Sequence, residues 1–397
     1  MQYDFKLNER TSLIPKLDMA RGNPITTAVS PDFTFSSGNV NFFGPVDPWQ
    51  NQAGYGSRYQ TEIEVNSNIT PNSNLTGGAG YQYNTVYSTN VFGNPGLQTS
   101  ANPADTVSSY GRATTFAYFQ YSGQLKTVGF TVGSRYEVTP FGQAFVPRFG
   151  LTYVKNNFNA KLLYGRAFRV PLLWQAYSRQ FAFRPDLKPL QPEFSNSYEL
   201  ELGYKISPFI KVSTNFFYIH INTPIFYLGS NNSYQNYGLI NSLGAESELQ
   251  LKYRNLGGFI NLSYATPGSN TSREFTNESR TAFLALPPFK ANIGTNYTFH
   301  NITVSSTITY LGTRYGQSKN SAISSLPSNI IYATTSYPSL LMVNAQLVYH
   351  ISKNFQINFL GNNIFNANYL AIQPYYGSHA PLPAFSRQIN IGVRLKI

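Results

Sequence analysis

Cysteine is absent from the 397-residue chain, and charged residues make up only 12% of it. Without cysteine, the chain can form neither a thiol nucleophile nor a cysteine-ligated metal site. Soluble domains carry about 25% charged residues, so the density of charge is roughly half of theirs. The longest apolar clusters are also far shorter than the ~18 residues that a transmembrane helix requires, which excludes such a helix.

Aromatic residues, in contrast, are abundant. Tyr and Phe occur 30 times each, and the mean hydropathy is still slightly negative at -0.25. This composition is typical of a barrel that has one lipid-facing side and one wet side. A membrane protein without an apolar helix must close its backbone hydrogen bonds in a barrel. We therefore predict an all-β fold, a transmembrane antiparallel up-and-down β-barrel.

The charge balance is basic, with 29 Lys and Arg against 17 Asp and Glu, a formal charge of +12. These cations are scattered singly, so the sequence predicts no nucleic-acid partner. The expected partner is outer-membrane lipid, with an interior and outer loops that favour anions. Residues 1–10 contain no apolar region of the kind that a secretory signal peptide requires for export. We therefore expect either a mature fragment or a reading frame that lacks its N-terminal part.

Alternation of apolar and polar residues is the strongest signal. In the last segment Ile389, Ile391 and Val393 fall on one face, and Asn390 and Arg394 fall on the other. A soluble β-sandwich also alternates. However, these runs are about 10 to 15 residues long, whereas soluble strands average about 5 to 6 and a tilted membrane strand needs about 9 to 11.

From residue 110 onward the alternation predicts about thirteen strands. They cover residues 110–123, 124–138, 144–154, 158–169, 195–206, 209–222, 244–253, 257–266, 288–299, 302–315, 340–350, 354–363 and 386–397. Except at 139–143, their connections alternate between short turns and long loops, as in outer-membrane barrels with short periplasmic turns. This parity places the C-terminus on the short-turn side.

The chain is accordingly divided at residue 110. Residues 1–109 are predicted to be poorly defined and loop-rich, with one or two barrel strands around 3–7 and 59–65. Gly, Pro, Asn, Ser and Thr dominate residues 66–109, which are predicted to form a long loop. Residues 110–397 are predicted to be C-terminal transmembrane β-barrel strands.

Several motifs follow one another in a recognisable order. The chain reads GRAFRVP at 165–171, RPDLKP at 184–189, YELEL at 198–202, GAESE at 244–248 and NNIFNANY at 362–369. Together they resemble the TonB-dependent outer-membrane receptor family. The residues that match the first two family motifs are Phe168, Arg169, Pro171, Pro185, Asp186 and Leu187. Arg184 stands where the family usually has Asn, and Ile397 ends the chain where the family usually has an aromatic residue.

The resemblance implies a receptor for active uptake of a metal chelate, such as a ferric siderophore or ferric citrate, at the bacterial cell outer membrane. Haem, nickel and cobalamin remain open as ligands, and no cofactor is expected. In this family the TonB complex acts through a plug domain, which the sequence does not contain. A full barrel has about 22 strands, so the thirteen to fifteen expected here indicate a fragment. The alternatives are a passive porin or surface adhesin without a plug, and a soluble all-β binding protein.

Arginine and aromatic residues in the long loops are the candidate ligand-binding residues, because Arg pairs with carboxylate oxygens and aromatic rings supply flat contact area. Loops of this composition could bind a negatively charged ferric chelate. The alternative is that these residues are ordinary loop charges without a ligand. The candidates are Arg179, Arg184, Tyr234, Tyr237, Arg273, Arg280, Arg314 and Tyr315. For Arg169 and Pro171 a purely structural role, ending a strand and fixing the entry to a loop, is equally open.

The sequence does not predict an enzyme. It has no G-x-S-x-G, H-E-x-x-H or P-loop pattern, and its four histidines lie far apart. The pairs Glu199/Glu201 and Glu246/Glu248 could serve acid–base chemistry, but the wet interior of a barrel explains them better. We predict no metal site. Ligation of a haem iron by His220 or His379, near the outer loops, is a less favoured alternative to simple solvation.

Overall fold

The structure is a computed structural model of the chain. It describes residues 2–25, 36–37, 40–41, 54–88, 108–172, 175–176, 188–228, 233–317, 334–372 and 382–395. Within these ranges, no helix is long and apolar enough to cross a membrane. Seventeen of the described strands belong to one sheet, and every strand pair with a described register in that sheet is antiparallel. The all-β prediction is confirmed.

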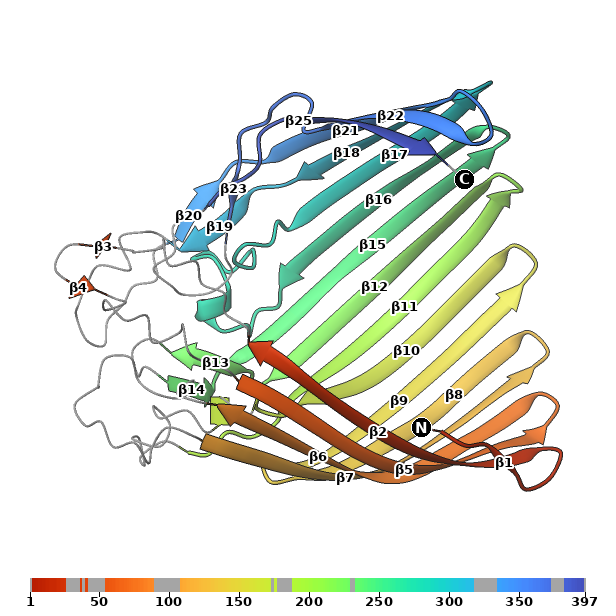
Figure 1. The fold of residues 1–397 in the computed structure, drawn as a ribbon, viewed down its shortest axis with the longest axis vertical. Coiled ribbons are helices and arrows are strands. Elements are labelled where there is room, and N and C mark those ends of the chain that lie inside the picture. Colours follow the sequence, from red (N-terminus) through yellow and green to blue (C-terminus); the bar gives the residue numbers. More distant parts are fainter. Residues whose placement is uncertain are drawn as a thin grey trace. The chain divides into compact units, whose positions relative to one another are not determined.

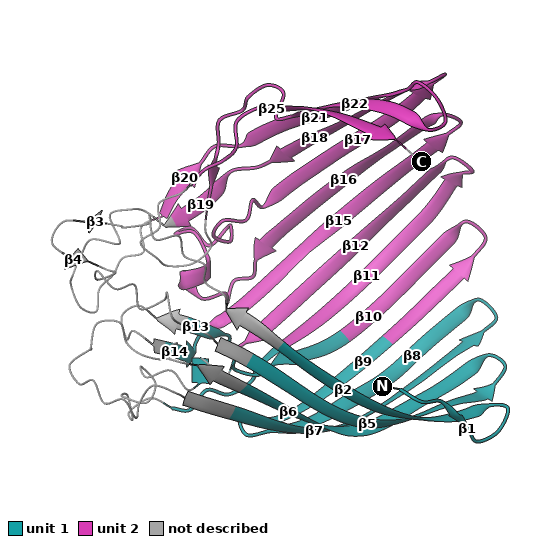
Figure 2. Cartoon of the chain, in the orientation of Figure 1, with its two compact units in different colours: residues 1–149, 165–194, 223–237 teal, residues 150–164, 195–222, 238–397 magenta. Residues whose placement is uncertain are grey.

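Two compact units make up the chain (Figure 2). Unit 1 comprises residues 1–149, 165–194 and 223–237, and unit 2 comprises residues 150–164, 195–222 and 238–397. Three strands contribute residues to both units: β9 (Gly142–Lys155), β10 (Phe158–Arg169) and β11 (Glu193–Ser207).

Unit 1 is built from strands of the large sheet that pair in sequence order and are long except for the two-residue β1 (Figure 1). They are β1 (Phe5–Lys6), β2 (Thr11–Ile25), β5 (Gly54–Thr70), β6 (Ser73–Ser88), β7 (Ser108–Leu125) and β8 (Val128–Thr139). Two small separate pairs are β3 (Ser36–Ser37) with β4 (Val40–Asn41), and β13 (Ile225–Leu228) with β14 (Ser233–Asn236).

Unit 2 continues the same up-and-down order, with short hairpin turns at one end of its strands (Figure 1). Its long strands are β12 (Ile210–Asn222), β15 (Leu239–Tyr253), β16 (Leu256–Pro267), β17 (Phe289–Phe299), β18 (Ile302–Leu311), β21 (Leu340–His350), β22 (Phe355–Asn362) and β25 (Gln388–Leu395). Its smaller elements are the 3-10 turn η2 (Arg273–Phe275) and the strand pairs β19 (Arg314–Gln317) with β20 (Thr334–Tyr337), and β23 (Leu370–Ala371) with β24 (Leu382–Pro383).

All thirteen strands predicted from residue 110 onward are strands in the structure. The largest differences lie at single ends. β15 begins at Leu239 rather than 244, β8 begins at Val128 rather than 124, and β18 ends at Leu311 rather than 315. The last difference arises because the chain continues from Leu311 into the separate hairpin of β19 and β20.

The predicted long loop over 66–109 is wrong between Ser73 and Ser88, where the chain forms β6. Glycines hide the alternation there, because they supply no side chain to count. They make room for rings from β7: a Cβ added at Gly80 would lie 2.5 Å from the Phe116 ring, and one at Gly78 would lie 2.7 Å from the Tyr118 hydroxyl. The same residues are cross-strand partners, so the aromatic rings cover the bare glycine backbone.

The two faces of the sheet differ in polarity as the alternation predicts. In unit 2, Leu249 pairs with Ile260 on one face, and Glu248 pairs with Asn261 on the other. Apolar side chains on the first face are exposed rather than packed; Ile389 and Ile391 of β25 are 72% and 69% exposed. In water such a surface would be unfavourable by about 25 cal/mol per Å2, so this face requires lipid.

Adjacent residues of β18 provide a test of this polarity. Ile308 lies on the apolar face opposite Ile293 and Val343, whereas Thr307 lies on the polar face opposite Gly294 and Asn344. We expect Ile308→Arg to lower the free energy of unfolding in lipid vesicles by about 2–4 kcal/mol, the cost of a cation on the lipid face near the midplane. The matched Thr307→Arg should change it far less. Urea titration of the folded band on a gel measures both, and equal losses would contradict the assignment of faces.

Candidate functional site

The end of β10 and the start of β11 are joined by an ion pair. The Arg169 guanidinium donates from Nε to Oε1 of Glu193 at 2.6 Å and from Nη2 to Oε2 at 2.9 Å. Oε2 of Glu193 also accepts the backbone N–H of Ile225 at 2.7 Å, at the start of β13. One carboxylate therefore holds three segments of unit 1, and the two parallel bonds fix its orientation.

The residues around this ion pair hold the ends of the loop that follows β10. Arg112 donates to the backbone oxygen of Pro171 at 3.2 Å, and Pro171 and Leu190 are almost fully buried. Gln191 and Asn236 exchange two hydrogen bonds, from Gln191 N at 2.7 Å and to Gln191 O at 2.9 Å. Both ends of the loop are thus fastened to the strands and to the β13–β14 hairpin.

The motif residues consequently have structural contacts. The Phe168 ring packs against Phe194 with centroids 6.3 Å apart, Arg169 binds Glu193, and Pro171 is buried. These contacts support the interpretation that Arg169 and Pro171 end a strand and fix the entry to a loop. Arg179, Arg184, Pro185, Asp186 and Leu187 lie outside the described residues, as does His379, so their roles stay predictions.

Tyr234 and Tyr237 belong to the β13–β14 hairpin of unit 1 and the residue after it. The hairpin closes through four paired positions and a bond from Tyr237 N to Pro224 O at 2.9 Å. Tyr237 is 37% exposed and Tyr234 is half-buried. The Glu193 carboxylate anchors this hairpin at Ile225, so the strands position these two rings even though the hairpin lies outside the large sheet.

In unit 2, the loop between β16 and β17 is folded around Asn277. Its buried side chain accepts the backbone N–H groups of Thr281 at 2.8 Å and Ala282 at 3.1 Å, and donates to the Thr281 hydroxyl at 3.0 Å. Ala282 and Leu284 are buried beneath the loop. Arg273 and Arg280, two of the predicted ligand residues, lie exposed on this ordered loop.

A second anchor fastens the start of the same loop. The buried Thr271 hydroxyl donates to Asn241 O at 2.9 Å and accepts Asn241 N–H at 3.0 Å. The Asn241 amide oxygen is 2.6 Å from Nδ1 of His220, which therefore carries the proton and donates. These bonds explain the half-buried position of His220 without a metal. Among the described residues, no group of three or more His, Asp or Glu could hold a metal ion.

Arg314 and Tyr315 lie at the start of β19, and their environments differ from those of Arg273 and Arg280. Arg314 is 7% exposed and donates from Nη1 to the Leu370 backbone oxygen at 3.0 Å. The Tyr315 backbone oxygen accepts Ala285 N–H at 2.7 Å, which ties β19 to the loop around Asn277. The structure thus brings Arg273, Arg280 and Tyr315 to one loop system, with Arg314 beneath it.

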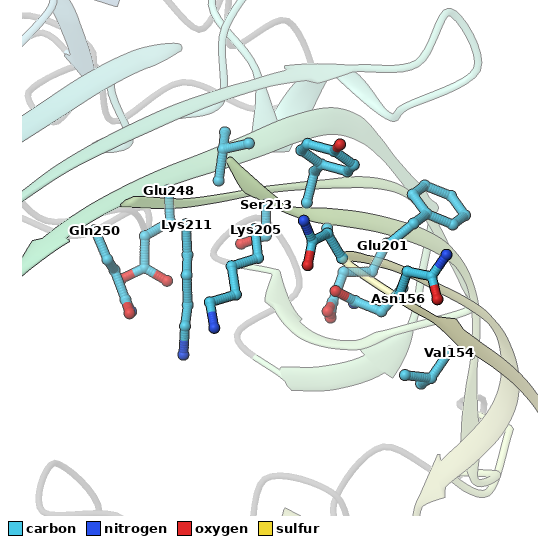
Figure 3. Close-up of a pocket in the computed structure, with 14 residues that line it drawn as sticks. Val154, Asn156, Glu201, Lys205, Lys211, Ser213, Glu248 and Gln250 are labelled. Carbon is cyan, nitrogen blue, oxygen red and sulfur yellow. The ribbon is translucent and has the colours of Figure 1, made fainter. Parts of the chain in front are cut away.

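The polar face of unit 2 forms a cavity of about 280 Å3 near the short-turn ends of β11, β12 and β15. Figure 3 shows Lys205 and Lys211 side by side there, near Glu248 and Gln250. Glu201, on the same face, binds Lys161 at 2.9 Å and 3.1 Å. Neither Lys205 nor Lys211 forms an ion pair with a described residue. The wall therefore carries charge of both signs, as expected of a wet surface.

The polar face of unit 1 carries a tighter cluster. The Tyr118 hydroxyl lies 2.6 Å from Oε1 of Glu62 and 2.6 Å from Oε2 of Glu64. One phenol proton can serve only one carboxylate at a time. The Lys16 ammonium supplies further donors, at 3.2 Å to Glu62 and 2.8 Å to Glu64. The cluster is satisfied internally and cross-links β2, β5 and β7.

The acidic pairs of the polar face also have ordinary partners. Glu199 accepts from the Asn215 amide at 3.3 Å, and Glu246 accepts from the Ser263 hydroxyl at 3.1 Å. These contacts bind neighbouring strands of unit 2 together. They fit the interpretation of Glu199, Glu201, Glu246 and Glu248 as interior charges rather than acid–base catalysts.

Long two-faced strands, exposed apolar side chains and a charged polar face define a transmembrane β-barrel protein. The family model described as "TonB dependent receptor-like, beta-barrel" matches residues 1–364. The chain belongs to this family, and its place is the bacterial outer membrane.

Solved structures of the same fold agree. The FrpB iron transporter of Neisseria meningitidis is 14% identical with a TM-score of 0.68, covering 99% of this chain and 62% of its own. The siderophore receptor PirA of Acinetobacter baumannii is 14% identical with a TM-score of 0.68, covering 97% and 60%. The ferric-catecholate import receptor Fiu of Escherichia coli K12 is 12% identical with a TM-score of 0.66, covering 99% and 63%. The chain thus spans about three-fifths of their length. No curated protein matches it.

Sequence reasoning missed Glu193, Asn277 and the carboxylates that meet Tyr118. Glu193 could have been found, because it opens the strand that follows Arg169 and therefore returns to the same end of the sheet. Asn277, four residues before Thr281, is a local turn signal of the kind that Asn provides. The meeting of Tyr118 with Glu62 depends on the pairing of three strands and had no local signal.

The three-way role of Glu193 predicts a local effect of its neutralisation. Glu193→Gln removes the charge-assisted bonds to Arg169 and Ile225, so hydrogen exchange at the Ile225 amide should become about five- to tenfold faster, given the partial exposure of the pair. Mass spectrometry of the 223–237 peptide measures this rate. Glu137→Gln, which removes the partner of Arg135 within β8, is the control. Unchanged exchange in Glu193→Gln would show that the carboxylate does not hold the hairpin.

Proposed function

We propose that this chain is part of an outer-membrane receptor for active uptake of a negatively charged ferric chelate, such as a ferric siderophore or ferric citrate. The observation that carries the proposal is the ordered loop around Asn277, which presents Arg273 and Arg280 to solvent and is tied through Ala285 to the backbone of Tyr315. Guanidinium groups pair with the carboxylate or catecholate oxygens of such chelates, and a preformed loop lowers the entropy lost on binding.

Family membership also supports the uptake of a ferric chelate. The similar solved structures are described as an iron transporter, a siderophore receptor and a ferric-catecholate import receptor. Their likeness shows the fold. Because Glu274 and Glu278 balance the net charge of the loop, the argument for an anionic ligand rests on the exposed guanidinium groups of Arg273 and Arg280. Of the other predicted ligand residues, Tyr237 is exposed on the anchored hairpin, and we keep it as a contact residue in the proposal.

Energy for uptake is proposed to come from the TonB complex through a plug domain. Residues 1–364 match the barrel model of the family, so chelate binding by this chain and TonB-driven uptake by the whole receptor are tested separately. Two assays are therefore needed. Binding is measured on the purified protein, and uptake is measured in cells that express the whole receptor.

Binding should depend on the two exposed arginines. In the double variant Arg273→Gln/Arg280→Gln, affinity for ferric citrate or a ferric catecholate should fall by about 100-fold or more, since two bonds to charged groups are lost and each is worth at least about 1.5 kcal/mol. Equilibrium binding of radioactive iron chelate to the detergent-solubilised receptor measures the change. Arg254→Gln/Lys353→Gln, which removes two cations from the short-turn ends, is the matched control.

Two results would contradict the proposal. If the arginine variant binds every chelate as tightly as the unchanged protein, the loop is not the ligand site. If iron uptake by the whole receptor persists in cells without TonB and the protein conducts ions in planar bilayers, a passive porin explains it better.

A further inference from the structure

The short turns of unit 2 carry positive charge and no negative charge. Taken together with the strand ends that flank them, the five turns are residues 155–158, 205–210, 252–256, 299–302 and 350–355, which read KNNF, KISPFI, KYRNL, FHNI and HISKNF. None of them contains Asp or Glu. The loop around Asn277, at the other end of the strands, mixes both signs, with Glu274 and Glu278 beside its arginines. On the short turns, in contrast, every charged side chain is a cation.

These cations divide between the two faces of the sheet. Lys205 and Lys211 line the polar cavity of Figure 3, and Lys252 lines the next hollow of that face. Lys155 follows the parity of Tyr153 and lies outside both linings. Arg254 and Lys353 are exposed turn residues. Arg254 also borders the hollow that Lys252 lines, but its guanidinium carbon lies 5.3 Å from the ring centre of Tyr253, which shares the parity of Leu249 on the apolar face. Lys155, Arg254 and Lys353 are hereafter the outer cations.

Aromatic rings lie at the turns that carry Lys155 and Arg254. Tyr153 packs against Phe158 at 6.2 Å, and Phe209 meets Tyr253 edge-on at 4.8 Å. Tyr253, Phe209 and Phe158 remain between 37% and 45% exposed. Tyrosine rings, with an apolar body and a polar hydroxyl, are enriched where hydrocarbon meets water, and here Phe158 and Phe209 pack against Tyr153 and Tyr253. They place the outer cations at the level of the lipid headgroups.

None of the outer cations forms an ion pair with a described residue, although all three are exposed. A lysine or arginine at a membrane surface can reach the headgroup region while its methylene stem covers apolar surface. Ammonium and guanidinium groups bind phosphate oxygens, and net attraction requires a lipid whose headgroup charge is negative overall.

We propose that the outer cations of unit 2 form a binding surface for anionic phospholipid headgroups in the leaflet that the short turns reach. An acidic protein is a poorer fit to this surface. It would have to cover exposed rings whose apolar bodies need hydrocarbon, whereas a phospholipid satisfies the cation and the ring at once. The inference is independent of the ligand proposed for the outer loops.

The test uses two variants with equal loss of charge. Lys155→Gln/Arg254→Gln/Lys353→Gln removes the outer cations, and Lys205→Gln/Lys211→Gln/Lys252→Gln removes three cations of the polar face. Each protein is folded into phosphatidylcholine vesicles that contain a small fraction of spin-labelled phosphatidylglycerol or spin-labelled phosphatidylcholine. Electron paramagnetic resonance then gives the relative association constant of the anionic lipid.

The unchanged protein should prefer phosphatidylglycerol, with each interfacial cation contributing on the order of a fivefold change at most, since a cation near an anionic surface is worth about 1 kcal/mol. The preference should disappear in the outer-cation variant, persist in the polar-face variant, and weaken in high salt for the unchanged protein. Single Arg254→Gln serves where the triple variant does not fold, and should lose part of the preference.

Three outcomes would overturn the proposal. The first is an unchanged protein that holds both lipids equally, and the second is an equal loss of preference in the two triple variants, which would indicate net charge alone. The third is an outer-cation variant that keeps the full preference. Heat-dependent mobility on a gel confirms that each protein compared is folded.

Discussion

Every backbone N–H and C=O group that enters hydrocarbon must find its partner within the protein, because lipid offers none. The antiparallel ladders of this chain meet that requirement strand by strand, as in β15, β16 and β17, whose registers run without a break. Once the backbone hydrogen bonds are made in this way, the lipid-facing and water-facing sides of a strand can differ only in their side chains. The two-residue period of the sequence follows from this constraint.

This arrangement inverts the distribution of polarity found in a soluble protein. The large apolar side chains are the exposed ones, and the polar face carries contacts such as Lys161 with Glu201 and Tyr118 with Glu62 and Glu64. On a wet inner surface, apolar burial cannot hold the strands together. The cross-strand polar bonds therefore add cohesion to the ladder on one face, while lipid surrounds the other.

The sequence predicted what depends on the strand period and little of what depends on contacts between distant segments. β10 was located to the residue, because its alternation is local and its turn is short. β6 was missed because Gly78 and Gly80 have no side chains to show the alternation. The space beside them is filled by rings of the neighbouring strand β7, which the local sequence does not reveal. For the same reason Arg169 could be singled out from sequence, but the link from its partner Glu193 to the distant Ile225 could not.

The scarcity of charge makes the position of each charge informative. With 29 Lys and Arg against 17 Asp and Glu, the cations outnumber the carboxylates that could pair with them. Three settings of described cations illustrate the difference. Lys161 on the inner wall meets a carboxylate, Arg273 and Arg280 are exposed on an ordered loop, and Arg254 and Lys353 are exposed at the short turns, Arg254 beside the Tyr253 ring. Only the first setting is compensated within the described part of the chain. The excess charge thus gathers at the two ends of the strands, where a barrel meets water, solutes and lipid headgroups, and where a partner of opposite sign can neutralise it.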